Sequence, residues 1–544
     1  MKNLLDVFSL LSVLLRGLTL FFQSLLIGGI AFRALLRYGV ATDSRQERFV
    51  PSTPWLFRTA TLGLAITQLA TVSISSAILM DTSGFRLRDV AGANFFVAGL
   101  VSAVCALLLT PYANAKSGSS AIQGLFGLTI LSCGVVTSHA WARVDNRMLL
   151  AGLTLVHHLA AGIWIGALPF LLITMRHVSS APLSSAITRS FSSMAAVGVA
   201  AILIAGVALS FLYMDSPTAF YGTSWGAMLG AKIWLVAGIL SIGALNFSIV
   251  RRFGLASGMD SRWLRWLIEA EIGIGFTAIL AAASLGSQPP AIDLPDGRVT
   301  THDLVQRFTP RLPRLRTPPL SALGAADEQI LKQEAESRGI PSSYVPGAPV
   351  LQPATPGDIA WSEYNHHWAG IVVLVMGLLA FASRSSRATW AANWPLLFLG
   401  LAVFLFFRAD AENWPLGPDG FWESFRVADV LQHRFFTLLI VGFAVFEWRV
   451  QNGRNTAAWT PYIFPAICAL GGAVLLTHSH GLSNVKEATL IELTHIPIAV
   501  LAVFAGWSRW LELRSHAAGS RVFAWIWPLC FIAIGSTLLL YREA

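Results

Sequence analysis

Long apolar runs recur along this 544-residue chain, and glycine, proline and charged residues separate them. Each run has roughly 18 to 25 residues, about the length of a helix that crosses a hydrocarbon core of about 30 Å. Lipid offers an open backbone no hydrogen-bond partners, and the alternation typical of a transmembrane barrel is absent, so only helices fit these runs. The pattern therefore predicts an all-α polytopic membrane helix bundle of about 14 transmembrane helices.

A polar interval rich in proline and charge divides the predicted spans into an eight-span half and a six-span half. The first eight lie near residues 17–36, 56–80, 90–111, 120–142, 147–174, 190–214, 225–249 and 263–285. The other six lie near residues 366–383, 393–409, 430–448, 460–478, 488–508 and 521–541. We expect an eight-helix membrane domain at 1–288, an outer connection at 289–360 with one helix in "AADEQILKQEAESRG", and a six-helix, histidine-rich membrane domain at 361–544.

Composition supports the membrane interpretation, because 55% of the residues are hydrophobic, 12% are charged and the mean hydropathy is +0.62. Ordinary soluble domains carry about twice that share of charge. Four cysteines all lie inside apolar runs without a C-x-x-C pair, so we expect buried small side chains rather than a disulfide framework. Glycine motifs such as "GGIAF" predict close helix packing.

Lysine and arginine are concentrated in the loops that follow odd-numbered spans, for example Arg251, Arg252, Arg262 and Arg265, and later Arg384 and Arg509. Because basic residues stay in cytoplasmic loops, this distribution places both termini on the outer side. The net charge of +9 is then mostly a topology signal, and nothing in it supports a nucleic-acid partner.

With this topology, nine of the twelve histidines lie at the outer face or in the outer half of the spans. They are His139, His157, His158, His366, His367, His433, His478, His480 and His495. A lone membrane histidine is most often a structural residue with a hydrogen bond across helices. Ionisable groups at membrane depth are costly, however, so several on one face indicate a functional region.

Neutral imidazole is a common ligand of copper and of other transition metals. Without a C-x-x-C motif and with only nine methionines, the chain favours an imidazole-rich copper site over a thiolate or thioether cage. Neighbouring histidines point about 100° apart on a helix, so one residue of each adjacent pair is expected to face a given site. Acidic residues near this face, among them Asp429, Glu487 and Glu492, could serve as further oxygen ligands or fix the imidazole tautomers.

Two charged residues lie inside consecutive predicted spans, Lys232 in "GAMLGAKIWLVAG" and Glu271 in "LIEAEIGIG". Their predicted depths are close enough for Lys232 to reach across. Two interpretations stay open: an ion pair that holds the helices together, and a step in the passage of an ion or a proton.

Four segments in order resemble the bacterial copper resistance protein D (CopD) family. They are "SHAWARVDNRMLLAGLTLVHHLAAGIWIGALPFLL", "RSFSSMAAVGVAAILIAGVALSFL", "YGTSWGAMLGAKIWLVAGILSIGALN" and "LIEAEIGIGFTAILAAASLGSQPP", within residues 1–290. The resemblance implies an inner-membrane protein that moves copper from the periplasm toward the cytoplasm, alongside a CopC-like periplasmic copper-binding partner. It places His139, one of His157 and His158, Lys232 and Glu271 at the family's polar positions. The doubled histidine in "VHHLAAG" departs from the family pattern, and the C-terminal half resembles an extension of longer members.

Together these observations predict a copper-handling membrane protein, not an enzyme, that binds copper ion at a periplasm-facing histidine cluster and transports it. The alternative is a membrane electron-transfer protein with haem held by axial histidines. The H-x-H pair of His478 and His480 disfavours haem, because axial ligands approach from opposite sides of a plane. A metal-dependent hydrolase lacks a supporting motif such as H-E-x-x-H.

Overall fold

The computed structural model describes residues 8–39, 53–114, 120–178, 181–252, 258–320, 356–384, 388–410, 413–417, 420–426, 428–454, 457–477, 485–515 and 521–543. Three sequence predictions lie outside these residues: His478, His480 and the helix expected at 325–339. The side chain of Asp429 is also outside the described part. The two histidines and Asp429 therefore remain predictions.

Within the described residues every regular element is helical, and each predicted span corresponds to a helix or to a helix with a short 3-10 or π segment. Eleven helices are long and apolar enough to cross a membrane, and α6 and α20 are shorter apolar helices. The all-α polytopic membrane bundle predicted from the sequence is thus confirmed.

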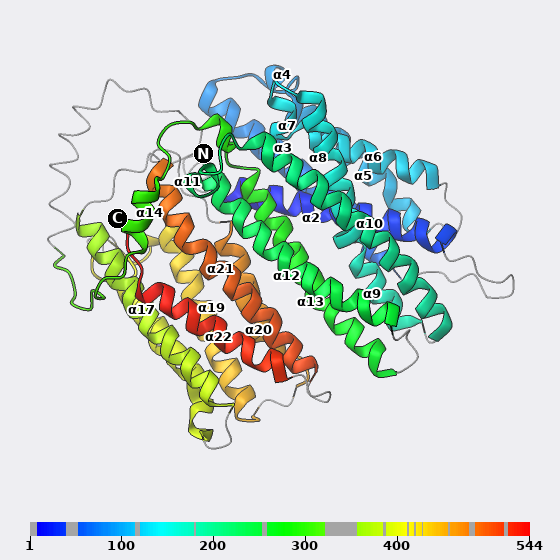
Figure 1. Cartoon of the computed structure of the whole chain (residues 1–544). Coiled ribbons are helices and arrows are strands. Elements are labelled where there is room, and N and C mark those ends of the chain that lie inside the picture. The colour runs from blue at the N-terminus through cyan, green and yellow to red at the C-terminus, as the bar shows by residue number, and fades with distance from the viewer. Residues whose placement is uncertain are drawn as a thin grey trace. The chain divides into compact units, whose positions relative to one another are not determined.

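The chain packs into two compact units (Figure 1). Unit 1 comprises Leu11–Pro217 and Lys232–Asp293. Its elements are α2 (Phe8–Ala34), η1 (Leu35–Gly39), α3 (Pro54–Ser83), α4 (Leu87–Val90), α5 (Asn94–Leu109), η2 (Thr110–Asn114), α6 (Ser120–Val136), α7 (His139–Ala142), α8 (Arg147–Ala161), the π segment η3 (Gly162–Gly166), α9 (Leu168–His177), α10 (Ala181–Tyr213), most of α12 (Ser224–Arg252), α13 (Gly258–Leu285) and η4 (Ala291–Asp293).

Unit 2 comprises Thr218–Ala231 and Leu294–Ala544, together with Lys2–Leu10. Its elements are α11 (Ala219–Gly222), the first turns of α12, α14 (Thr301–Phe308), α17 (Pro356–Ala382), η5 (Thr389–Leu396), α18 (Leu397–Arg408), η6 (Ser424–Arg426), α19 (Ala428–Gln451), η7 (Thr460–Tyr462), α20 (Ile463–Leu475), α21 (Val485–Arg514) and α22 (Arg521–Leu539). The helix pairs α17 and α22, α20 and α21, and α21 and α22 pack closely along their lengths (Figure 1).

Local sequence signals account for several helix ends. Helix α3 begins with Pro54, whose missing N–H costs nothing in the first turn, and it ends at Gly84 with a positive φ of 67°. Helix α14, which the sequence analysis did not predict, begins with a capping box. The Thr300 hydroxyl accepts from the Asp303 N–H, and the Asp303 carboxylate accepts from the Thr300 N–H.

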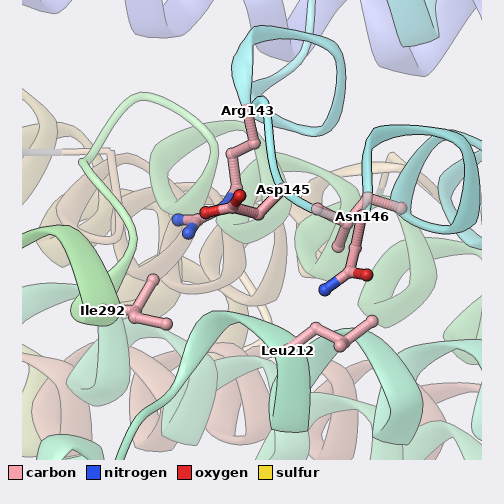
Figure 2. A pocket seen from close by; sticks show the side chains of 6 residues that line it. Arg143, Asp145, Asn146, Leu212 and Ile292 are labelled. Carbon is pink, nitrogen blue, oxygen red and sulfur yellow. The ribbon is translucent and has the colours of Figure 1, made fainter.

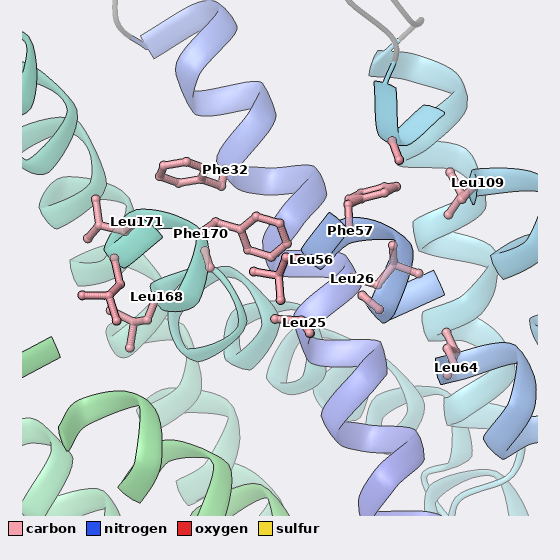
Figure 3. Packing of buried hydrophobic residues seen from close by; sticks show 14 of the residues in the cluster. Leu25, Leu26, Phe32, Leu56, Phe57, Leu64, Leu109, Leu168, Phe170 and Leu171 are labelled. Atoms are coloured by element: carbon pink, nitrogen blue, oxygen red, sulfur yellow. The ribbon is translucent and has the colours of Figure 1, made fainter. Parts of the chain in front are cut away.

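The core of unit 1 surrounds α2, where Leu26 and Phe32 pack with Phe57 of α3 and Phe170 of α9 (Figure 3). A glycine contact fixes how closely the π segment η3 approaches α2. A Cβ atom on Gly28 would lie 2.0 Å from the Gly166 carbonyl carbon, and one on Gly166 would lie 1.8 Å from the Ser24 carbonyl oxygen. The close packing predicted from "GGIAF" is therefore confirmed by backbone contact that only glycine permits.

Unit 2 has an aromatic core together with a buried ionic network. Arg509 of α21 donates to Glu447 of α19 at 2.9 Å and to Glu512 at 2.8 Å, and Glu512 also accepts from Arg384 and from Trp527. Arg509 is 4% exposed. The sequence predicted that Arg509 lies in a cytoplasmic loop. The structure instead places it within α21, buried beside carboxylates of two helices that neutralise it, while its cytoplasmic side stays a prediction.

Candidate functional site

Unit 2 brings two of the predicted ligands together. His366 lies near the start of α17 and His495 in the first third of α21, and their ring centroids are 5.8 Å apart at an interplanar angle of 86°. Tyr541, just past the end of α22, stacks on His366 with centroids 3.9 Å apart and meets His495 edge-on at 5.9 Å. The start of α17, the end of α22 and the start of α21 therefore contribute one aromatic and imidazole cluster.

Both imidazoles are held in the same way by their own helices. Nδ1 of His366 lies 2.8 Å from the Ser362 carbonyl oxygen, and Nδ1 of His495 lies 2.8 Å from the Ile491 carbonyl oxygen. A carbonyl oxygen only accepts, so each neutral ring carries its proton on Nδ1 and its lone pair on Nε2. In this tautomer Nε2 can bind a metal ion. The hydrogen bond from Nδ1 to the backbone carbonyl fixes the ring orientation, as such bonds do for metal-binding histidines.

Glu543 lies next to this pair at the C-terminal end of the described chain. It accepts hydrogen bonds from Ser362 at 2.5 Å and from the Tyr541 hydroxyl at 2.6 Å. Burial raises the pKa of Glu543, but a protonated His366 ring and the two hydroxyl donors together lower that pKa below its usual range. Burial and the same carboxylate raise the pKa of the Tyr541 phenol. The cluster thus combines an anionic carboxylate with two imidazoles, a combination that suits a cation.

His367 is placed differently from its neighbour. Its Nδ1 accepts from the Arg314 backbone N–H at 2.7 Å, and its Nε2 donates to the Tyr541 carbonyl oxygen at 2.8 Å. Both ring nitrogens are therefore used in holding loop backbone, and the residue is buried. Of the adjacent pair, His366 is the residue with an Nε2 that binds no backbone group among the described residues.

The other predicted residues of unit 2 with described side chains lie on α19 and α21. His433 of α19 is half exposed, and its Nδ1 lies 2.7 Å from the Asp410 carboxylate, which follows α18. Glu492 precedes His495 by three residues on α21, so the two share a face, and Glu492 is buried. Glu487 lies in the first turn of the same helix and is partly buried.

Within the described parts of both units, no three His, Cys, Asp or Glu side chains are arranged to hold a metal ion. His366 and His495 are therefore a pair rather than a complete ligand set in this structure. The cluster of five outer histidine positions predicted in this half stays a prediction, since His478 and His480 lie outside the described residues.

Unit 1 holds a second group of imidazoles. His157, on α8, faces Lys232 of α12, with the Lys232 Nζ atom 3.3 Å from His157 Nε2. His158 follows on the same helix. Nδ1 of His157 and Nδ1 of His158 are both buried, and the described residues give neither of them a hydrogen bond of good geometry. Two imidazole nitrogens of α8 are therefore weakly held by the described part of the protein.

The predicted ion pair between Lys232 and Glu271 is not formed. Glu271 of α13 lies against Gly243 and Asn246 of α12, which follow Lys232 by 11 and 14 residues. At 1.5 Å per residue, this separates the two charged groups by about 16 to 21 Å along α12. The ion-pair interpretation was wrong because span boundaries read from sequence do not fix the vertical register of antiparallel helices.

Glu271 instead accepts two hydrogen bonds from neutral donors. Its Oε1 accepts from the Trp164 indole N–H at 2.8 Å, and its Oε2 accepts from the Asn246 amide at 2.7 Å. Trp164 lies in the π segment η3, six residues after His158, and π segments occur frequently at functional sites. Sequence reasoning missed both donors, although "GIWIG" begins only four residues after His158. The neighbouring Glu269 pairs with Arg176 of α9 at 2.7 Å.

His139 begins the short helix α7, outside the spans. Burial and the nearby Arg16 guanidinium lower the pKa of His139, and backbone groups at Gly286 and Gln288 together with Asp293 oppose this only in part. Its Nε2 atom is buried without a hydrogen-bond partner. The imidazole is therefore neutral at physiological pH and has a nitrogen to offer.

An open pocket of about 430 Å³ lies close to the same end of unit 1 (Figure 2). Arg143, Asp145 and Asn146 form its polar side, while Leu212 and Ile292 face them. Arg143 also pairs with Asp293 at 2.6 Å. Leu150 of α8 lines the pocket too, and Thr154, His157 and His158 follow it at helical spacing of three or four residues. One face of α8 thus runs from the pocket to the imidazoles.

Comparisons with known proteins agree with these features. Residues 185–285 match the family model described as "Copper resistance protein D". The copper transport protein CutJ of Bacillus subtilis (strain 168) is 24% identical over 217 residues, which are 39% of this chain and 38% of that relative. The chain thus spans well under half the length of the relative it matches, and no solved structure matches. The segment that forms most of α10, α12 and α13 is thus similar to the copper resistance protein D family, and the many apolar helices indicate a multi-pass membrane protein.

Proposed function

We propose that this protein binds copper on the periplasmic side of the bacterial inner membrane and transports it across or into that membrane. The observation that carries the proposal is the family match through α10, α12 and α13, the helices that hold Lys232 and Glu271. Both names found in the comparisons concern copper, and they point to a transport-type membrane protein rather than an enzyme.

His366 and His495 support copper capture in unit 2. Each Nε2 carries a lone pair, and Glu543 supplies a negative charge beside them. Two imidazoles form an incomplete ligand set for copper, so further ligands must join when the ion binds. His433, His478, His480 and Glu492 are the residues that we propose for this role.

His139, His157 and His158 support a second copper position in unit 1. The pocket beside Arg143 would admit the ion, and the face of α8 that carries Thr154 would lead it to the imidazoles. Lys232 sets a condition on this route. Its ammonium occupies the His157 Nε2 lone pair, so a cation that binds there must first displace Lys232 or its proton.

The partner and the topology belong to the same proposal. A CopC-like periplasmic copper-binding protein would deliver the ion, and both termini would face the periplasm, as the distribution of basic residues predicts. The division into regions 1–288, 289–360 and 361–544 is likewise proposed.

Metal analysis of the purified protein tests copper capture. A His366→Ala/His495→Ala variant is expected to lose copper relative to wild type. A His302→Ala variant, which removes an exposed histidine of α14, is expected to keep it. Unchanged copper in the double variant would exclude the pair from the site. A Soret band with sub-stoichiometric copper would favour the haem alternative.

Copper uptake into sealed vesicles tests transport itself. Vesicles with the wild-type protein are expected to accumulate copper faster than vesicles without protein, and His157→Ala/His158→Ala is expected to lose this difference. A variant that binds copper as wild type does but fails in uptake would separate the position in unit 1 from capture in unit 2. Equal accumulation in vesicles with and without wild-type protein would refute transport.

A further inference from the structure

Glu271 is a carboxyl group in the middle of a predicted span, with no cation beside it. It is 3% exposed, and its hydrogen-bond partners are Trp164 and Asn246, both neutral. Glu269, two residues earlier on α13, has the ion pair with Arg176 that a buried carboxylate ordinarily requires. The two carboxyl groups of one helix therefore differ in whether the protein supplies a counter-charge.

The charged groups on the surrounding helices are engaged elsewhere or remote. Arg176 of α9 pairs with Glu269, and Lys232 of α12 contacts His157. Arg33 of α2 donates to the carbonyl oxygens of Tyr112 and Ala113. Arg16 of α2 lies against Gly286, which directly follows α13 and is fifteen residues beyond Glu271, or about 22 Å along the helix axis. The segment η3 contributes no titratable side chain. Among the described residues, Glu271 thus has no ionic partner.

An unpaired carboxylate charge at this depth is costly. Glu271 therefore needs one positive charge that no described side chain of the protein supplies. The atoms available favour a proton over a copper ion. They are the two carboxylate oxygens and the buried Asn246 Oδ1, which has no hydrogen-bond partner. Oxygen donors are poor ligands for copper in comparison with imidazole or sulfur, whereas a single proton suits a carboxylate with an amide neighbour.

The two hydrogen-bond donors distinguish the two oxygens of Glu271. An indole N–H can only donate, so Trp164 keeps Oε1 as an acceptor in every state. An amide can donate through Nδ2 or, after rotation by half a turn, accept through Oδ1. In its present orientation the Asn246 amide donates through Nδ2 to a charged Oε2. After the rotation its Oδ1 accepts from a protonated Oε2. The 2.7 Å separation is suitable for either hydrogen bond.

We propose that Glu271 is a proton-exchange site, in which Oε2 binds and releases one proton as the charge in unit 1 changes. The exchange with a passing copper cation rests on the proposed transport function. Copper arriving near the carboxylate displaces the proton from Oε2 to water, and a proton returns to Oε2 when copper leaves. No electron moves, and the proton released to water offsets one unit of the charge that copper brings into unit 1. Trp164 acts on this exchange by position, as a fixed donor to Oε1, and not by binding the proton of Glu271.

Infrared difference spectroscopy of the purified protein tests proton binding without any transport. A change of pH is expected to produce a carboxylic acid C=O band in wild type and in Glu269→Gln, and to lose one such band in Glu271→Gln. Trp164→Phe is expected to keep the band at a higher stretching frequency, because the C=O group has lost a hydrogen bond. An unchanged set of bands in folded Glu271→Gln would overturn the proposal.

Proton movement in vesicles tests the exchange with copper. With a pH-sensitive dye inside, wild type and Glu269→Gln are expected to show copper-dependent proton movement, and Glu271→Gln is expected to fall to the level of protein-free vesicles. Retained copper-dependent proton movement in Glu271→Gln would refute the exchange. If wild type fails to take up copper, the transport function fails, while the infrared result still decides whether Glu271 binds a proton.

Discussion

Replacing Arg509 by methionine tests how the interior of unit 2 tolerates charge. Arg509 is the cation between Glu447, which is fully buried, and Glu512, which is 5% exposed. Without it, Arg384 alone faces two carboxylates, and Glu447 retains only the hydrogen bond from Gln451 at 2.7 Å among its described contacts. Breaking a buried ion pair by removing one partner costs about 3–5 kcal/mol, because the remaining charge stays buried without compensation.

The assay is the midpoint of thermal unfolding in one detergent, together with unfolding free energies where the transition is reversible. Arg509→Met is expected to lose about 3–5 kcal/mol. Arg176→Met breaks the ion pair of a half-exposed arginine with Glu269 and serves as the matched comparison. It is expected to lose less, because solvent screens a partly exposed charge. Adding Glu447→Gln to Arg509→Met should recover most of the loss. If Arg509→Met is no more destabilising than Arg176→Met, the reasoning about the buried network is wrong.

Two further predictions concern α14 and the glycine contact in unit 1. The Thr300 backbone N–H, then Lys486 and the Thr300 hydroxyl, lower the pKa of Asp303 to about 2. Since the folded-state pKa is below the unfolded value of about 3.9, the stabilisation is present above about pH 4 and is lost as the pH falls toward 2. In Lys486→Met the pKa of Asp303, followed by its infrared carboxylate band, should rise; an unchanged titration would exclude the ion pair. Gly166→Ala places a methyl group 1.8 Å from the Ser24 carbonyl oxygen, so folding yield in membranes should fall sharply, whereas Gly152→Ala, with open space around it, should express as wild type. Equal yields would show that α2 and η3 can separate at little cost.

The histidines show how much of the candidate site could be predicted from the sequence. Their concentration on one predicted face drew attention to His366 and His495, and the structure brings these two rings together. The sequence did not distinguish His366 from His367, because both follow the same helix start. Tertiary contacts decide the difference, since the Arg314 N–H and the Tyr541 carbonyl oxygen occupy both nitrogens of His367. Tyr541 and Glu543 were not predicted, because a lone tyrosine and a lone glutamate near a chain end carry no pattern.

The sequence by itself determined the class of the protein and the order of its helices. In lipid, the backbone of a single spanning segment satisfies all its hydrogen bonds only as a helix. The length of an apolar run is therefore enough to predict a span. Which polar groups meet was decided by the tertiary structure. The register of α12 against α13 separated Lys232 from Glu271 and placed Asn246 beside the carboxylate, while η3 supplied Trp164. Hydrophobicity specifies that a helix crosses the membrane, but it is nearly constant along a span and so leaves vertical register to side-chain packing between helices.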